Sequence, residues 1–82
     1  MDNKKHELVI NVVKKINEKY SIHDFRMVKG PSHTNLVFDL LLPPGDKTDH
    51  NLLKESIIAE VKKIDPSLNC VMKIEHDFTA RT

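Results

Sequence analysis

The sequence predicts an α+β fold in which two helices pack on one face of a three-stranded mixed sheet. Three observations lead to this prediction. Apolar residues recur at helical spacing in two segments, they alternate or run together in three shorter segments, and Pro and Gly clusters separate several of these segments. The resulting order is helix, strand, strand, helix, strand. Because 82 residues have room for only one hydrophobic core, residues 1–82 are expected to form a single domain.

The first helix is expected from residue 4 to about residue 19, with Asp2 or Asn3 as its N-cap. Lysines lie on the side opposite an apolar stripe, as in a helix that covers a core. The stripe consists of Leu8, Val9, Val12, Val13 and Ile16.

Two strands are expected next, over residues 22–28 and 34–42, joined by a turn at Gly30-Pro31-Ser32. In the first strand, alternation places Phe25 on one face and Asp24 on the other. The second strand has apolar residues on both faces, which is typical of a strand at the centre of a sheet.

A second helix is expected from about Thr48 to Ile64, with Thr48 as its cap, and a last strand from Cys70 to about His76. This helix is long enough to return the last strand parallel to the second strand. Both helices then cover one sheet face. The other face is left open although it carries Val37, Leu41 and Val71, and an exposed apolar face predicts association into a homodimer.

Composition excludes several classes of function. The thirteen basic and twelve acidic side chains nearly cancel, which gives no reason to expect a nucleic-acid partner. The longest apolar stretch, residues 36–42, is interrupted by Asp39, so no bilayer span is predicted and the chain is expected to be soluble. A single cysteine, Cys70, favours a reducing, cytosolic compartment.

Side chains of the kind that bind metal ions gather near the strand ends. They are His23, Asp24, His33, Asp39, Glu75, His76 and Asp77, with His50 at the start of the second helix. Neutral imidazole and carboxylate are the usual ligands of zinc and its first-row neighbours. Alternation places Asp39, Glu75 and Asp77 together on the open face, where close carboxylates repel one another unless a cation is present. The alternative is that these acidic strand ends simply face water.

Strict alternation creates a conflict for the two strand histidines. It places His23 and His76 in phase with Phe25 and Ile74, on the face covered by the helices. They are then either at the rim of the sheet, where side chains can turn, or packed in the core. We expect no enzyme, because no nucleophile lies in a motif that pairs it with a base and no HExxH or glycine-rich phosphate loop occurs.

Two blocks of the sequence stand out. The first is Ile22-His23-Asp24-Phe25-Arg26, followed by Gly30-Pro31-Ser32-His33-Thr34-Asn35-Leu36-Val37-Phe38-Asp39. The second is Ile74-Glu75-His76-Asp77-Phe78. Together they resemble the C-terminal cytoplasmic domain of cation diffusion facilitator (cation efflux) transporters. The resemblance covers about residues 8 to 78. It implies a metallochaperone-like, ferredoxin-like two-layer sandwich that binds metal, forms a homodimer and controls transport by the transmembrane part of the same transporter at the cytoplasmic face of the membrane.

The resemblance also implies a ligand set. His23, Asp39 and Asp77 match metal-binding positions of the family, Glu75 replaces a histidine, and His50 matches a histidine that some members carry. His76 and His33 are further candidates. Carboxylates at 39 and 75 make the site harder than a histidine-rich one, so zinc is expected with manganese or iron as alternatives. Two other readings stay open: a domain that binds a small organic ligand, and a structural dimerisation module with a degenerate metal site.

Overall fold

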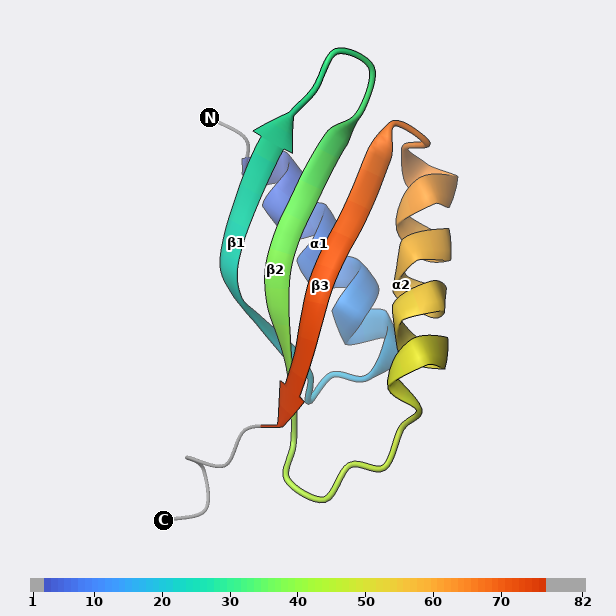
Figure 1. Cartoon of the computed structure of the whole chain (residues 1–82). Coiled ribbons are helices and arrows are strands. Elements are labelled where there is room, and N and C mark those ends of the chain that lie inside the picture. The colour runs from blue at the N-terminus through green and yellow to red at the C-terminus, as the bar shows by residue number, and fades with distance from the viewer. Residues whose placement is uncertain (1–2, 77–82) are drawn as a thin grey trace.

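A computed structural model describes residues 3–76 of the chain. The elements are α1 (Asn3–Ile16), β1 (Ser21–Lys29), β2 (Thr34–Leu42), α2 (His50–Ile64) and β3 (Leu68–His76). In Figure 1 α1 passes behind the sheet and α2 runs beside β3, and the sheet face that the helices leave open is turned toward the viewer. The α+β fold and the order of its elements are therefore confirmed.

The sheet has the strand order β1-β2-β3, so β2 lies at its centre as predicted. β1 pairs with β2 antiparallel through a hairpin, and β3 pairs with β2 in parallel. α2 makes the crossover that a parallel pair requires. The carboxyl ends of β2 and β3 consequently lie at the same end of the sheet as the start of β1.

The core lies between the helices and one face of the sheet. On β2, the side chains of Leu36, Phe38, Leu40 and Leu42 are at most 1% exposed, which fits a central strand. The remaining buried residues come from both helices, the loop before β1, and β3: Val9, Val12, Val13, Tyr20, Leu53, Ile57, Val61, Leu68, Cys70 and Met72. Burial of a large aliphatic side chain contributes about 1.5 to 3 kcal/mol, so this set supplies most of the stability of a small domain.

α1 ends at Ile16, about three residues before the predicted end, and Ile16 is 39% exposed. The reason is local. The Asn17 side chain accepts a hydrogen bond from the Lys19 backbone N–H at 2.9 Å, and the Tyr20 N–H donates to the Asn17 carbonyl at 3.0 Å. Such side-chain bonds compete with helical ones and close a turn instead.

The N-cap of α2 is Asp49, so the prediction of Thr48 was wrong. The Asp49 Oδ1 atom accepts hydrogen bonds from the backbone N–H groups of Asn51 at 2.9 Å and Leu52 at 3.2 Å. The Thr48 hydroxyl instead lies 3.0 Å from the Tyr20 hydroxyl. The Tyr20 hydroxyl also donates a hydrogen bond to Asp46 Oδ2 at 3.1 Å. Tyr20 thus attaches the loop between β2 and α2 to the core.

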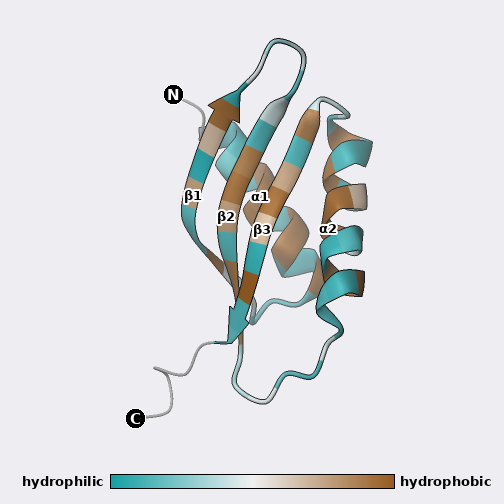
Figure 2. Cartoon of the chain, in the orientation of Figure 1, coloured by the Kyte–Doolittle hydropathy of each residue, from teal (hydrophilic) through white to brown (hydrophobic). Residues whose placement is uncertain are grey.

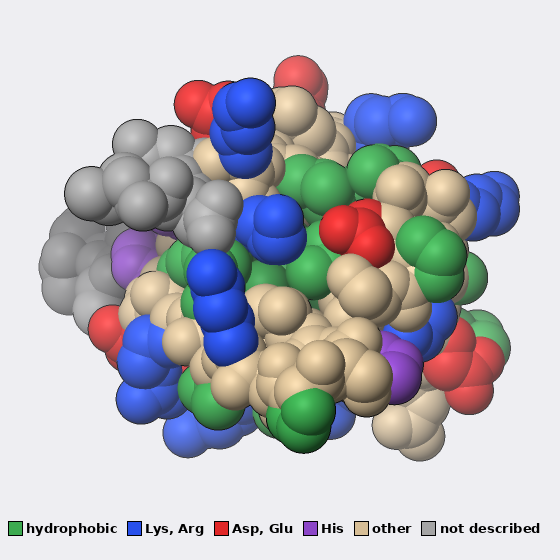
Figure 3. Space-filling model, turned by 90° about the horizontal axis from the view of Figure 1, so that it is seen from above, with side chains coloured by type: hydrophobic (Ala, Val, Ile, Leu, Met, Phe, Trp, Pro, Cys, Tyr) green, Lys and Arg blue, Asp and Glu red, His purple; other side chains and the backbone are tan. Residues whose placement is uncertain are grey.

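Charged side chains are spread over the surface. In the end-on view of Figure 3, Lys and Arg side chains are interspersed with a smaller number of Asp and Glu side chains. None of the helices within residues 3–76 is long and apolar enough to cross a membrane.

Candidate functional site

The candidate site lies on the sheet face that the helices leave uncovered. Within residues 3–76 no helix or strand packs on this face, and polar and apolar bands alternate along its strands (Figure 2). Residues that pair directly across neighbouring strands point to the same side of a sheet, so the register defines the face. Its members are Ser21, His23, Arg26 and Val28 from β1, Asn35, Val37, Asp39 and Leu41 from β2, and Asn69, Val71, Lys73 and Glu75 from β3.

A β-bulge in β1 resolves the conflict over His23. His23 pairs with Asp39 and Arg26 pairs with Val37, so three steps along β1 match two steps along β2. One extra residue is accommodated near Asp24, whose φ of 55° lies in the left-handed region. The alternation is therefore interrupted, and His23 lies on the uncovered face although Phe25 lies on the covered one. The expectation that His23 shares the face of Phe25 was wrong.

Packing on the covered face explains why the bulge is needed. Ile22 and Met27 pack against the core from this side, and so does Phe25, whose ring lies 6.4 Å from that of Phe38. Residues 22 and 25 are an odd number apart, so a regular strand cannot place both on one face. Ile22, Phe25 and Met27 are spaced by three residues and then by two. This irregular spacing in the sequence indicated a bulge, which an assumption of strict alternation does not allow.

His23 and Asp39 are the predicted ligands that the fold brings together. As a directly opposite antiparallel pair, their Cβ atoms are expected to lie about 4.5 to 5.5 Å apart. At that separation an imidazole nitrogen and a carboxylate oxygen can reach the same cation. His23 is exposed and Asp39 half-buried, so both are open to solvent on the uncovered face.

β3 brings one carboxylate and one ammonium group next to this pair. Lys73 is the ladder neighbour of Asp39, and Glu75 is the neighbour of Leu41, one step further along the same face. The Lys73 Nζ atom lies 3.3 Å from Glu75 Oε2. Glu75 therefore lies on the predicted face near Asp39, but its carboxylate is paired with a lysine whose place in the site was not predicted.

His76 lies at the rim of the sheet, which was one of its two predicted positions. It is the last residue of β3, it pairs with Leu42, and its Nδ1 atom is 3.4 Å from the Pro43 carbonyl oxygen. Its ring centroid is 5.5 Å from that of His50 at the start of α2. Two imidazoles thus meet beside the carboxyl end of β3, on the helix side of the sheet.

His33 lies apart from the other candidates. It precedes β2 in the hairpin turn, and its Nδ1 atom is 3.0 Å from the Ser32 hydroxyl. Asp39 is six residues further along the extended chain, a separation of about 20 Å at 3.3 Å per residue. Within one chain, therefore, His33 cannot share a metal ion with Asp39 or with His76, and its inclusion with the other candidate ligands is corrected.

Asp77 lies outside the described residues. Within residues 3–76, no group of three or more His, Cys, Asp or Glu side chains is arranged to hold a metal ion. Cys70 is buried under the helices, and burial raises the pKa of its thiol to about 11, with Lys62 acting weakly in the opposite direction. A thiol that stays protonated at neutral pH is a poor metal ligand and nucleophile.

His6 has a packing role that was not recognised in the sequence. Its ring stacks on Phe25, with centroids 4.6 Å apart and an angle of 15° between the planes. α1 therefore touches the covered side of β1 at the bulge whose other side carries His23. The imidazole and the aromatic ring are nineteen positions apart in the sequence, so no local pattern indicated this contact.

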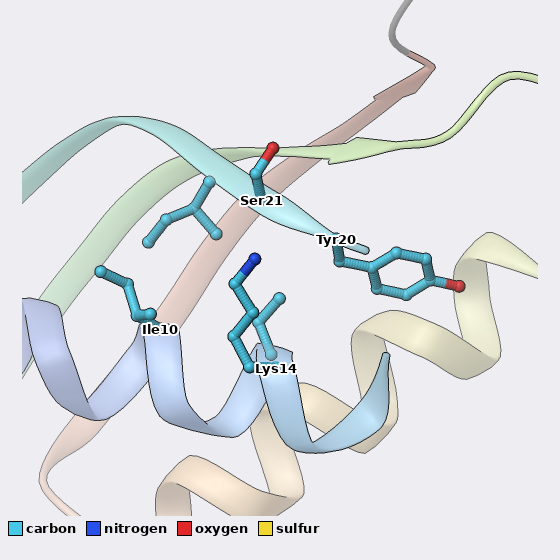
Figure 4. Close-up of a pocket in the computed structure, with 6 residues that line it drawn as sticks. Ile10, Lys14, Tyr20 and Ser21 are labelled. Atoms are coloured by element: carbon cyan, nitrogen blue, oxygen red, sulfur yellow. The ribbon is translucent and has the colours of Figure 1, made fainter. Parts of the chain in front are cut away.

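A small pocket lies between α1 and the start of β1 (Figure 4). Its volume is about 150 Å³, and its lining is mostly apolar, with Ile10, Val13 and Ile22 joined by Lys14 and Ser21. The Tyr20 ring points away from the pocket toward α2. Pockets for organic ligands usually measure about 300 Å³ or more, so this one fits only a very small molecule.

Comparison of the chain with protein-family models, curated proteins and solved structures gives no match.

Proposed function

We propose that this chain is a divalent-cation-binding domain that pairs with a second copy through its uncovered sheet face and regulates a cation exporter. The observation that carries the proposal is the pairing of His23 with Asp39 on that face, produced by the β-bulge at Asp24. An imidazole and a carboxylate on adjacent strands, both open to solvent, supply two ligands for zinc. The exporter role rests on the resemblance to cation diffusion facilitator domains.

Two protein ligands leave coordination positions to be filled. Asp77 follows β3 directly in the sequence and is a candidate for the third ligand. Water or a residue of the second copy would complete a tetrahedral shell, with ligand bonds of about 2.0 to 2.2 Å for zinc. Imidazole favours zinc, whereas the carboxylates leave manganese and iron as alternatives.

Apolar side chains around the ligands support self-association. Val71 is 52% exposed and Val28 is 55% exposed, and both belong to the uncovered face. Val37 and Leu41 on β2 are only half-buried there, although β2 is the central strand. Removing such a patch from water is the main driving force for association.

Metal titration of the purified chain tests the first half of the proposal. Zinc at a hundredfold excess over the dissociation constant stabilises the bound form by about 2.7 kcal/mol, which raises the midpoint of thermal unfolding by roughly 10 to 20 °C in a domain of this size. The pair Asp39→Asn and Asp77→Asn, or His23→Ala alone, should abolish this gain and leave the metal-free fold intact. His33→Ala is the matched control, because His33 lies at the other end of the sheet, and it should keep the full gain.

The pH dependence provides a second readout. An imidazole coordinates only in its neutral form, so zinc affinity should fall as the pH is lowered, because protons compete with the metal for the ring nitrogen. A wild-type chain that shows no melting shift with zinc, manganese or iron would contradict metal binding. The reading as a structural dimerisation module would then be preferred.

Analytical ultracentrifugation tests the proposed pairing of two copies through the uncovered sheet face. Leu41→Glu should shift the chain toward monomer with an unchanged far-UV spectrum, because it places a charge in the proposed interface. Leu52→Glu is the control, since Leu52 is 61% exposed on α2 and lies away from the sheet face. A wild-type chain that stays monomeric at about millimolar concentration, with and without metal, would rule out the dimer.

A further inference from the structure

One ammonium group lies beside both described carboxylates of the proposed site. Lys73 is the ladder neighbour of Asp39, and its Nζ atom is 3.3 Å from Glu75 Oε2. The other cation of this face, Arg26, is opposite Val37, two residues from Asp39 along β2. Lys73 thus combines a position next to one candidate ligand with an ion pair to another.

The ion pair does little for the fold. The side chain of Lys73 is 71% exposed and that of Glu75 is 46% exposed. Exposed pairs of this kind contribute between nothing and a small part of the stability of a domain, because water and salt screen them. The effect of Lys73 is therefore expected in what Glu75 is able to bind.

We propose that Lys73 sets the metal preference of the site, by occupying Glu75 and so favouring zinc over manganese. This inference rests on the proposed function. Manganese prefers oxygen ligands and depends on the number of carboxylates, whereas zinc binds well to imidazole. With Glu75 held by the ammonium group, the candidate ligands left among the described residues are His23 and Asp39, one imidazole and one carboxylate, which suit zinc better.

Two effects are expected when Lys73 is replaced by a residue without a charge. For charges roughly 7 Å apart, loss of a positive charge strengthens the binding of any dication by about threefold at physiological salt. Release of Glu75 adds a carboxylate ligand, and ligand charge tunes oxygen-rich sites by about tenfold or more. The second effect benefits manganese more than zinc, so the ratio of the two affinities should change.

Calorimetric titration of the chain with zinc chloride and with manganese chloride, in 0.15 M salt, measures that ratio. For Lys73→Gln we expect zinc to bind about threefold more tightly and manganese, which gains from both effects, about thirtyfold more tightly, so that the preference for zinc falls about tenfold. Thermal unfolding of the metal-free variant should match that of the wild type.

Two further variants separate the causes. Arg26→Gln removes a charge from the same face without releasing Glu75, so both metals should gain by a similar small factor and the ratio should not change. Lys73→Gln combined with Glu75→Gln should remove the additional gain of manganese.

The outcomes distinguish this inference from the function on which it rests. A wild type that binds metal, with the same zinc-to-manganese ratio in Lys73→Gln, would overturn the role of Lys73 and leave the proposed function standing. A wild type that binds neither metal would overturn both. A change of ratio in Lys73→Gln that persists in the double variant would show that Glu75 is not the residue through which Lys73 acts, and would also overturn the inference.

Discussion

The bulge at Asp24 can be tested through the backbone conformation of a single residue. Asp24 has a φ of 55°, and it is the only described residue other than glycine with a positive φ. For a residue with a Cβ atom, the left-handed conformation costs about 1 to 2 kcal/mol of stability, whereas glycine has no such cost. At an ordinary strand position the order is reversed, because glycine loses more entropy on folding and is about 0.5 to 1 kcal/mol worse than alanine.

The difference in stability between Asp24→Gly and Asp24→Ala isolates the cost of the left-handed backbone, because both substitutions remove the carboxylate. Subtracting the entropy cost of glycine from the cost of the left-handed backbone leaves glycine the more stable by roughly 0.5 to 1 kcal/mol. The same pair of substitutions at Arg26, two residues along the same strand, should give the opposite sign. Glycine should therefore be more stable than alanine at position 24 and less stable than alanine at position 26.

Urea denaturation followed by circular dichroism at 222 nm measures all four variants. A difference of 1 kcal/mol corresponds to about 4 to 8 °C in the melting midpoint of a domain of this size, which is well within reach. Alanine proving as stable as glycine at position 24 would mean that the backbone there is not left-handed. The left-handed bulge described at Asp24 would then be wrong, and the placement of His23 on the uncovered face would lose this support.

Three further predictions concern Tyr20, Asp46 and Cys70. Tyr20→Phe removes the hydroxyl that contacts Asp46 and Thr48 and should cost about 1 kcal/mol, measured by urea denaturation. Hydrogen bonds from Thr48, followed by a weaker one from Tyr20, hold the pKa of Asp46 below its ordinary value of 3.8. The stability that Asp46 contributes should therefore be complete at neutral pH and disappear as the pH falls through its lowered pKa, so Asp46→Asn should destabilise the chain at pH 7 and less in strong acid. Burial raises the pKa of the Cys70 thiol from 9.0 to about 11, which lowers its thiolate fraction by about a hundredfold at neutral pH, so iodoacetamide should label the native chain at least about a hundredfold more slowly than the urea-unfolded chain. Labelling at equal rates would show that Cys70 is not buried.

Much of the fold was accessible from the sequence because its signals are local. The predicted range of the second strand agrees with β2 (Thr34–Leu42) at both ends, since apolar residues fill both faces and turn residues lie on either side. The predicted end of α2 at Ile64 is also confirmed. The capping residue was missed by one position, because Thr48 and Asp49 are both good N-caps and only the contact of Thr48 with Tyr20, across 28 positions, decides between them.

The metal-type residues were visible in the sequence, but their arrangement was not. Their identities follow from composition, whereas their grouping depends on strand register, which joins residues far apart in the chain. His23 lies on the uncovered face because Ile22 and Phe25 both pack into the core and force a bulge between them. Lys73 lies beside Asp39 only because the parallel pairing of β2 and β3 sets that register. Local periodicity therefore determined which segments form helices and strands, and tertiary packing decided which side chains meet, because burial of apolar groups outweighs the strict alternation of a regular strand.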